Sequence, residues 1–358
     1  MNIVESRNLG REPTTLGKEV GALDLYDGLS TPFSEDVIQL VPEHVEQIEA
    51  YALTSAALYG PADGNKEPTY VQNTLDMPSL VVRIDCTVID GNIVTYEMED
   101  SPSGQGITDR IHRSVGAVGI KDLILNHYQI QVGDIPRVII SGARGHGTDD
   151  AMIVGPDKYV FDTDGILTLS KDELVIVKTI PGVKDSQSAY ISLQSRAVAP
   201  LATEGNKTYL ERRGDLRPVA TADELLVDDD GNLISQVMKA RLGSMAMGVS
   251  MYLTSADKEL FTRAGTVTAS RLRRQVEDYN QTLDGALVQP FNAPILIENN
   301  EGRKNAIMRV FVLLGKNNNT PTARVIGGCY VARPGMIVHG AGDAVSGAVV
   351  VQEDYVSC

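Results

Sequence analysis

The stretch Gln236–Tyr252 constrains the fold of this chain more than any other. It is typical of a β-strand that carries Lys239, a loop of small residues from Gly243 to Gly248, and a returning strand with alternating polarity. Glycine and small residues let backbone N–H groups approach phosphate oxygens, and a lysine at the mouth of the loop adds a positive charge. The stretch therefore predicts a lid over nucleotide phosphates, against the alternative of a plain hairpin with a surface lysine.

Composition excludes several classes of protein. The net charge of −15 and the pI near 4.8 argue against binding to nucleic-acid backbone or to an anionic membrane, because both need a basic surface. Cys86, Cys329 and Cys358 show no C-x-x-C spacing, so we expect neither a disulfide framework nor structural zinc. The first residues lack a signal-peptide pattern and no window is long enough for a membrane span, which predicts a cytoplasmic location.

The N-terminal third predicts an irregular start followed by helices. Residues 1 to 35 are polar and glycine-punctuated, which is typical of an arm on the surface. From Ser34 to Leu58 apolar residues recur at roughly helical spacing, and Pro42 divides this segment into two expected helices. A loop is expected over residues 60–76. Residues Thr108–His127 then predict one further helix.

Two β-rich runs flank Asp90-Gly91-Asn92, within residues 79–100, and this is a strong hairpin signal. Because side chains alternate along a strand, Arg83 and Asp85 share one face of the first strand, and Glu97 and Glu99 share one face of the second. Pairing across the turn brings the four charges together. Three carboxylates with a single arginine favour a hard cation such as Mg²⁺, and the alternative is a solvated polar face.

The middle of the chain predicts a strand at residues 137–141, followed by a glycine-rich loop at 142–147 that contains His146. This loop suggests either a substrate site or a plain turn between a strand and a helix, because its spacing is not G-x-G-x-x-G. Short strands are expected around Tyr159–Phe161 and Leu174–Lys178, with a domain boundary near Pro200.

The second half supplies the remaining expected elements. A short helix opens at Lys207, so that two lysines, Lys207 and Lys239, are available for the two ends of a phosphate chain. Residues 270–280 predict a basic amphipathic helix. Residues 287–291 predict an apolar strand and hinge whose backbone groups hydrogen-bond an adenine edge. Two long strands, 306–314 and 323–333, flank a turn at 315–320, and a second small-residue loop covers 338–347.

This order of motifs resembles the ATP-grasp superfamily, in particular its circularly permuted branch that includes glutathionylspermidine synthetase. The resemblance covers roughly residues 80 to 350. The matching motifs are Arg83-Ile-Asp85, Glu97-Met-Glu99, Asn206-Lys207, Lys239 through Gly248, Gln289-Pro-Phe291, and Arg309 with Gly327, Gly328 and Arg333. Glu99 stands where the family usually has Asn, and it still offers metal-binding oxygens.

The resemblance implies an α+β ATP-grasp fold in which two β-rich lobes clasp ATP, together with an N-terminal, pre-ATP-grasp α/β region. The expected division is an N-terminal arm with helices (1–78), a metal-binding hairpin with an α/β region (79–200), a lid and hinge lobe (201–300) and C-terminal strands that complete the core (301–358). The implied activity is an ATP-dependent carboxylate–amine ligase. A substrate carboxylate attacks the γ-phosphoryl group, and an amine then displaces phosphate from the acyl phosphate to form an amide, with ADP released.

The resemblance also assigns roles to individual residues. The implied ATP contacts are Lys207, Lys239, Gly243, Ser244, Met245, Ala246, Gly248, Gln289 and Phe291; the implied Mg²⁺ ligands are Asp85, Glu97 and Glu99; and the implied catalytic arginines are Arg83, Arg309 and Arg333. Two alternatives remain open, a non-catalytic ATP-binding module and a phosphotransferase that shares the clamp. Neither the carboxylate, nor the amine, nor the oligomeric state follows from the resemblance.

Overall fold

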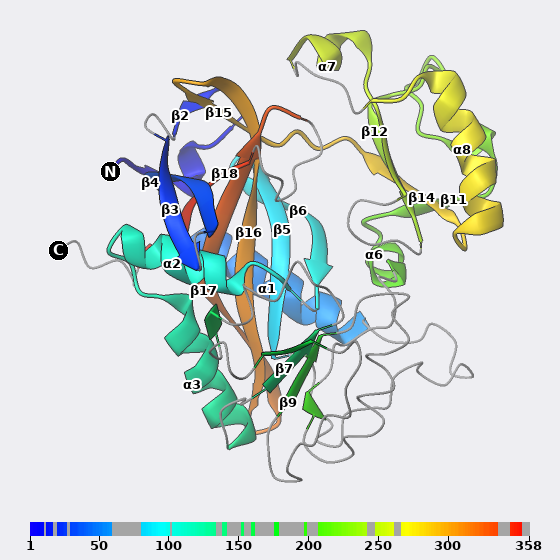
Figure 1. The fold of residues 1–358 in the computed structure, drawn as a ribbon. Helices are drawn as coiled ribbons and strands as arrows, with labels where there is room; N and C mark the ends of the chain where they lie inside the picture. Colours follow the sequence, from blue (N-terminus) through cyan, green and yellow to red (C-terminus); the bar gives the residue numbers. More distant parts are fainter. Residues whose placement is uncertain are drawn as a thin grey trace.

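The computed structural model describes most of the chain with gaps. The described residues are 1–10, 12–16, 20–26, 29–58, 80–100, 102–133, 138–141, 152–153, 159–161, 175–178, 197–198, 207–241, 248–260, 266–335 and 344–352. Over these residues the fold is mixed α+β, as expected, and a large curled β-sheet dominates it (Figure 1). None of the described helices is both long and apolar enough to cross a bilayer.

Within the described residues, ten strands form the large sheet, in the order β1-β4-β18-β17-β16-β15-β2, with β3 beside β4 and the β5–β6 hairpin beside β16. The strands are β1 (Ile3–Glu5), β2 (Thr14–Thr15), β3 (Val20–Tyr26), β4 (Leu29–Leu40), β5 (Val81–Ile89), β6 (Asn92–Glu99), β15 (Ile295–Asn299), β16 (Gly302–Asn317), β17 (Thr320–Arg333) and β18 (Val345–Val351). Along β16, β15 pairs with its first residues and β5 with its middle, so both lie on the side opposite β17.

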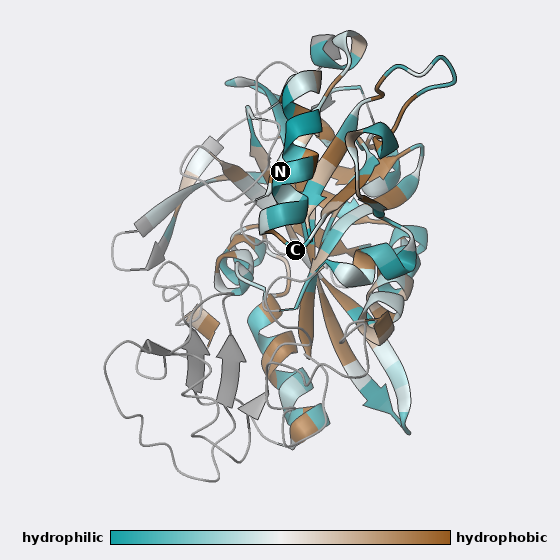
Figure 2. Ribbon diagram, turned by 90° about the vertical axis from the view of Figure 1, so that its right-hand side faces the viewer, coloured by the Kyte–Doolittle hydropathy of each residue, from teal (hydrophilic) through white to brown (hydrophobic). Residues whose placement is uncertain are grey.

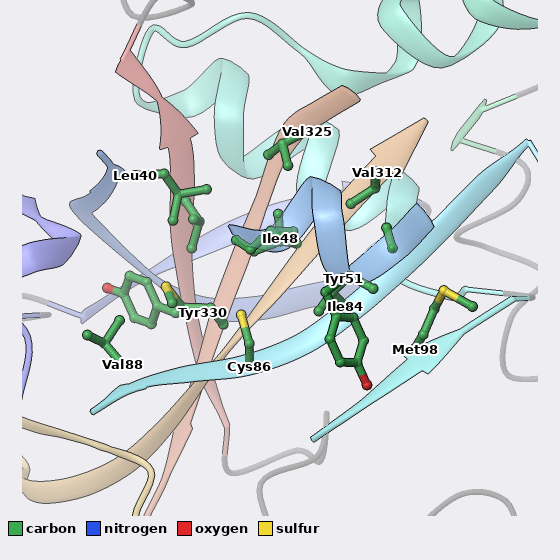
Figure 3. Close-up of a cluster of buried hydrophobic side chains, with 14 of the residues drawn as sticks. Leu40, Ile48, Tyr51, Ile84, Cys86, Val88, Met98, Val312, Val325 and Tyr330 are labelled. Carbon is green, nitrogen blue, oxygen red and sulfur yellow. The ribbon is translucent and has the colours of Figure 1, made fainter. Parts of the chain in front are cut away.

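Helices cover both faces of this sheet. Helix α1 (Pro42–Leu58) packs on one face, where Ile48, Ile84 and Tyr330 belong to the largest apolar cluster (Figure 3). Helices α2 (Gln105–Ser114) and α3 (Ile120–Val132) cover the other face. The central strands are hydrophobic on both sides for this reason, and the polar faces of the helices point outward (Figure 2). Each large aliphatic side chain buried here stabilises the fold by about 1.5–3 kcal/mol.

A smaller antiparallel sheet forms a separate layer at the side of the large one (Figure 1). Its strands are β11 (Arg217–Val219), β12 (Gln236–Ala240), β13 (Val249–Tyr252) and β14 (Ala286–Pro290), and α8 (Ala269–Thr282) packs on one face of it. Helices α6 (Thr208–Arg213) and α7 (Ser255–Leu260) and the short turn η4 (Ala222–Glu224) accompany this sheet, while η1 (Ser6–Asn8) follows β1. A third, parallel sheet contains β7 (Val138–Ser141), β8 (Tyr159–Phe161), β9 (Val175–Lys178) and β10 (Ala197–Val198).

The expected N-terminal arm is wrong. Residues 1–35 contribute β1 to β4 instead, and β4 lies inside the large sheet, parallel to both β1 and β18. Val37 and Ile38 have adjacent positions in β4 and are both fully buried, so neither face of the strand is exposed here and the pattern does not alternate. The expected helix before Pro42 is wrong for the same reason. Pro42 is instead the first residue of α1, a position where its missing N–H has no cost.

The single helix expected over residues 108–127 is also wrong, because the segment forms α2 and α3. The chain leaves α2 through Gly116, at φ +75°, and Gly119 precedes α3. A left-handed φ is adopted easily only by glycine, and it ends a helix. The apolar periodicity continues across the break because both helices pack on the same face of the sheet.

Most other expected elements are confirmed. These are the hairpin at residues 79–100, the strands near 138–141, 159–161 and 175–178, the helix that opens at Lys207, the strands on either side of the 243–248 loop, the helix near 270–280, the strand before the hinge, and the long β16–β17 pair. The loops expected at 60–76 and 142–147, with His146, and the boundary near Pro200 lie outside the described residues. So does most of the 338–347 loop, whose last residues belong to β18.

Candidate functional site

The β5–β6 hairpin brings the four charged residues of the sequence pattern together. Asp90 and Gly91 form its turn with φ of 50° and 76°, the left-handed values that a tight hairpin needs. In the register, Arg83 lies opposite Glu99 and Asp85 lies opposite Glu97. A β-bulge between these pairs and the turn places one extra residue in β6, so that Tyr96 has no partner in β5.

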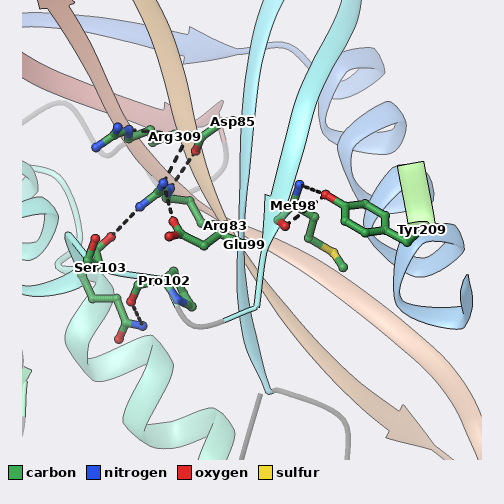
Figure 4. A network of polar contacts seen from close by, with 9 residues as sticks. Arg83, Asp85, Met98, Glu99, Pro102, Ser103, Tyr209 and Arg309 are labelled. Carbon is green, nitrogen blue, oxygen red and sulfur yellow. Dashed lines mark hydrogen bonds and ion pairs between the residues drawn. The ribbon is translucent and has the colours of Figure 1, made fainter. Parts of the chain in front are cut away.

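The guanidinium of Arg83 lies at the centre of this cluster (Figure 4). Its Nε and Nη2 donate to the two oxygens of Asp85 at 2.7 and 3.2 Å, Nη2 also forms an ion pair with Glu99, and Nη1 donates to the Ser103 carbonyl at 3.0 Å. From β16, the register partner of Asp85 is Arg309, whose Nε is 3.8 Å from the Asp85 carboxylate. Arg309 Nε is buried and makes no hydrogen bond within the described residues.

Burial and charge act in opposite directions on these groups. Burial alone would lower the pKa of Arg83, but the carboxylates of Asp85 and Glu99 outweigh it, so the net pKa is raised. Burial raises the pKa of Glu99, and Arg83 counteracts only part of that rise. The Glu99 side chain is 39% exposed, yet its Oε2 atom is buried. The cluster is therefore a partly dry network in which each charge depends on a neighbour.

Lys239 reaches this hairpin from the small sheet. Its ammonium donates to the Tyr96 carbonyl at 2.9 Å and lies 3.9 Å from the Glu97 carboxylate. Burial lowers the pKa of Lys239, Glu97 raises it in part, and Lys207 lowers it further. The two sequence-predicted lysines therefore lie close enough to influence each other, and both are buried. Lys207 is the residue immediately before α6, as expected.

Part of the predicted phosphate loop lies outside the described residues, namely Gly243, Ser244, Met245 and Ala246. Its last residue, Gly248, has φ +72° and accepts a hydrogen bond from the Ala240 N–H at 2.7 Å. A Cβ at Gly248 would lie 2.6 Å from the Ala240 Cβ, so only glycine fits this close approach.

The hinge residues Gln289 and Phe291 belong to the small sheet and its edge, whereas the last predicted arginine, Arg333, lies in the large sheet. Gln289 is buried in β14, two residues from Leu287, which is the register partner of Lys239. Gln289 therefore shares with Lys239 the face of the small sheet opposite α8. Phe291 packs against an apolar cluster that contains Val237. Arg333 is four residues along β17 from Cys329, the register partner of Arg309, which is about 13 Å of strand.

The three carboxylates fit Mg²⁺ in kind but not in this arrangement. Carboxylate oxygens are the ligands that Mg²⁺ prefers. However, the Arg83 guanidinium stands between Asp85 and Glu99, and Glu97 faces Lys239. Among the described residues, no three or more His, Cys, Asp or Glu side chains are placed to hold a metal ion. A cation at these oxygens therefore requires Arg83 to release at least one of its two carboxylates.

The free edge of β6 is covered by side chains that the sequence pattern did not reveal. The Tyr209 hydroxyl of α6 donates to the Met98 carbonyl at 3.1 Å and accepts from the Met98 N–H at 2.6 Å (Figure 4). Gln47 of α1 accepts from the Ile93 N–H at 2.8 Å. Together with the Lys239 bond to the Tyr96 carbonyl, these hydrogen bonds satisfy backbone groups on the edge of β6 that no described strand pairs with. No short-range signal marks them, because each joins segments far apart in the sequence.

The chain matches no known protein-family model, and no curated protein matches it.

Proposed function

We propose that the protein is an ADP-forming carboxylate–amine ligase of the circularly permuted ATP-grasp type. The observation that carries the proposal is the meeting of Lys239 with Tyr96 and Glu97. It joins a lysine of a small antiparallel sheet to an acidic hairpin of a large sheet, and a nucleotide bound between two β-layers needs this pairing of groups. Neither half of the pairing would favour the proposal alone.

In this proposal the lysine and arginine side chains of the site bind the phosphates of ATP. Lys207 and Lys239 bind the phosphate chain, and the loop that ends at Gly248 closes over it. The hinge at Gln289–Phe291 holds the adenine edge through backbone groups. Arg309 Nε, which has no hydrogen bond within the described residues, is available to an anionic oxygen. Arg83 and Arg309 then stabilise charge on the transferred phosphoryl group and on the tetrahedral intermediate, with Arg333 assisting.

Asp85, Glu97 and Glu99 are the proposed Mg²⁺ ligands. Bound there, Mg²⁺ would supply charge neutralisation for the phosphate oxygens. When Arg83 Nη2 leaves Glu99, it can turn to the phosphoryl group while Nε stays on Asp85, so the same movement opens the Glu99 carboxylate and delivers the arginine. The chemistry transfers the γ-phosphoryl group to a substrate carboxylate, and an amine nitrogen then forms the new C–N bond as phosphate leaves.

The test is calorimetric titration of ATP, with and without Mg²⁺, into the wild type and into Lys239→Ala and Glu97→Ala. We expect metal-dependent binding that both substitutions weaken at least tenfold. Pairs of carboxylates and amines are then screened for ADP release. Binding without ADP release from any pair would favour a non-catalytic module, ADP release without an amine would favour a phosphotransferase, and no binding to the wild type would overturn the proposal.

A further inference from the structure

A cavity of about 540 Å³ lies between α1, the first half of β6, the end of α6 and the link from β14 to β15. Its lining residues are Gln47, Ala50, Tyr51, Thr54, Ile93, Val94, Thr95, Arg213, Asp215, Gln289 and Asn292. Thr95 lies opposite Cys86, whose side chain packs in the core under α1. The cavity is thus on the α1 face of the hairpin, and the cluster around Arg83 is on the other face. It is a separate site of a size suited to a small molecule.

One wall of the cavity holds a charged pair with unused hydrogen-bonding capacity. Arg213 Nε donates to Asp215 Oδ2 at 2.9 Å, the Tyr51 hydroxyl donates to the same oxygen at 3.4 Å, and the Arg213 guanidinium lies 4.0 Å from the centre of the Tyr51 ring. These contacts fix both charged side chains, which remain 17% and 29% exposed. Within the described residues, the terminal nitrogens of Arg213 and Oδ1 of Asp215 make no hydrogen bond.

This pair matches the charges of an amino acid. A guanidinium presents paired N–H groups that fit a carboxylate, and a carboxylate beside it accepts from an ammonium group. The wall carries one charge of each sign, so a zwitterion is neutralised group by group. Because Arg213 and Asp215 already neutralise each other, a ligand with a net charge would bring an uncompensated charge into a partly buried site.

The cavity is also lined by side-chain amides. Gln289 is 5% exposed and lines the cavity. The Gln47 amide oxygen accepts a hydrogen bond from the Ile93 N–H, which leaves the Gln47 amide nitrogen as a donor. Asn292 also lines the cavity. A carboxamide pairs with another carboxamide through one donor and one acceptor on each side.

We propose that this cavity binds a free amino acid with a carboxamide side chain, glutamine or asparagine. Arg213 receives its α-carboxylate, Asp215 its α-ammonium group, and the amides of Gln289 and Gln47 its side chain. The proposal does not require nucleotide binding: of the residues proposed to contact ATP it uses only Gln289, through its side-chain amide, whereas the proposed adenine hinge uses backbone groups.

The test is calorimetric titration of the full chain with L-glutamine, L-asparagine, L-glutamate and adenosine. We expect saturable binding of L-glutamine or L-asparagine, weaker binding of L-glutamate, and at least tenfold weaker binding of the preferred amino acid to Arg213→Lys and to Asp215→Asn. Arg212→Lys is the matched control, because Arg212 donates to the Leu58 carbonyl and does not line the cavity.

Ala50→Leu provides a second variant that keeps every polar group. Ala50 is an exposed residue of α1 at the cavity wall, so leucine narrows the cavity at little cost to folding. It is expected to abolish amino-acid binding and to leave ATP binding unchanged, which separates this proposal from the ligase proposal. Absence of amino-acid binding at millimolar concentration, or binding that Arg213→Lys and Asp215→Asn leave intact, would overturn it. Adenosine binding that depends on Asp215 would assign the cavity to a nucleoside instead.

Discussion

The ammonium of Lys239 lies 2.9 Å from the carbonyl oxygen of Tyr96, so a strand of the small sheet contacts the edge strand of the large one. The contact depends on the bulge in β6, which leaves Tyr96 without a partner in β5. A regular hairpin would place the carbonyl groups of this strand differently. One inserted residue thus decides where the two sheets meet and which carboxylate, Glu97, faces the lysine.

Lys239→Met tests the electrostatics of this contact. Burial lowers the pKa of Lys239, so the unfolded chain holds this proton to higher pH than the folded chain does. The contribution of Lys239 to stability is therefore present above its unfolded pKa of about 10.4 and is lost as pH falls through the lowered folded pKa. Relative to Lys239→Met, the wild type is expected to gain stability as pH rises toward 10.

The measurement is urea unfolding followed by circular dichroism between pH 7 and pH 10. Lys316→Met, at an exposed position of β16, controls for the loss of a lysine as such. A constant difference between wild type and Lys239→Met across this range would contradict the prediction.

Arg83→Met tests the buried network. It leaves the carboxylates of Asp85 and Glu99 without their shared cation, and such a loss costs about 3–5 kcal/mol in the free energy of unfolding. Replacing Asp85 with Leu in the same chain is expected to restore part of this loss. Glu5→Gln removes the exposed Arg7–Glu5 pair and is expected to cost at most ~1 kcal/mol. Equal losses from the buried and exposed pairs, measured by chemical denaturation, would refute the argument.

Tyr209→Phe tests how the position of β6 affects the proposed metal ligands. The ring stays in the core, but both backbone groups of Met98, the residue between Glu97 and Glu99, lose their hydrogen bonds to the Tyr209 hydroxyl. We expect a loss of about 1–3 kcal/mol in stability and a larger loss of ATP affinity with Mg²⁺ than without it.

Tyr128→Phe is the matched control for this substitution. Tyr128 is also buried, and its hydroxyl makes no hydrogen bond within the described residues, so its loss is expected to change neither quantity. Equal effects of Tyr209→Phe on ATP affinity with and without Mg²⁺ would mean that Tyr209 serves stability alone.

Gly328→Ala tests the packing of the central strands. A Cβ at this position would lie 2.0 Å from the Arg309 carbonyl oxygen in the neighbouring strand, and the backbone cannot move away without breaking the pairing. We expect a loss of at least ~3 kcal/mol in stability. Gly335→Ala, where the nearest atom is 3.9 Å away, is expected to be tolerated. Thermal unfolding of the two variants gives the comparison.

The parts of the fold that follow local rules could be predicted from the sequence. The Asp90-Gly91 turn and the alternation on either side of it predict the hairpin, with Arg83 and Asp85 on one face of β5 and Glu97 and Glu99 on one face of β6. That these two faces coincide depends on the bulge at Tyr96, because an unbroken register from the turn would pair Asp85 with Tyr96 and place Glu97 and Glu99 on the opposite face.

The parts that depend on distant segments could not be predicted. Strand β4 pairs with β1 and β18, which are far apart in the sequence, and at Val37 and Ile38 apolar clusters bury both of its faces, so the sequence shows no alternation there. Tyr209 and Gln47 are ordinary helix residues until β6 lies beside them. Asp215 likewise gains its contact with Tyr51 only when α6 meets α1. In each case the contact that gives the residue its role joins segments far apart in the sequence, which helix or strand periodicity does not reveal.

The parallel pairing of β4 with β18 has a consequence for synthesis in the cell. Val37 lies beside Ala348, so β4 must wait for a segment that is synthesised roughly 310 residues later. Until then β4 and β17 each lack the neighbour that joins them, and both carry apolar side chains on strands with unpaired backbone groups. The nascent chain therefore has a long interval in which chaperone binding or aggregation competes with closure of the sheet, and stalled or truncated products will be far less soluble than the finished protein.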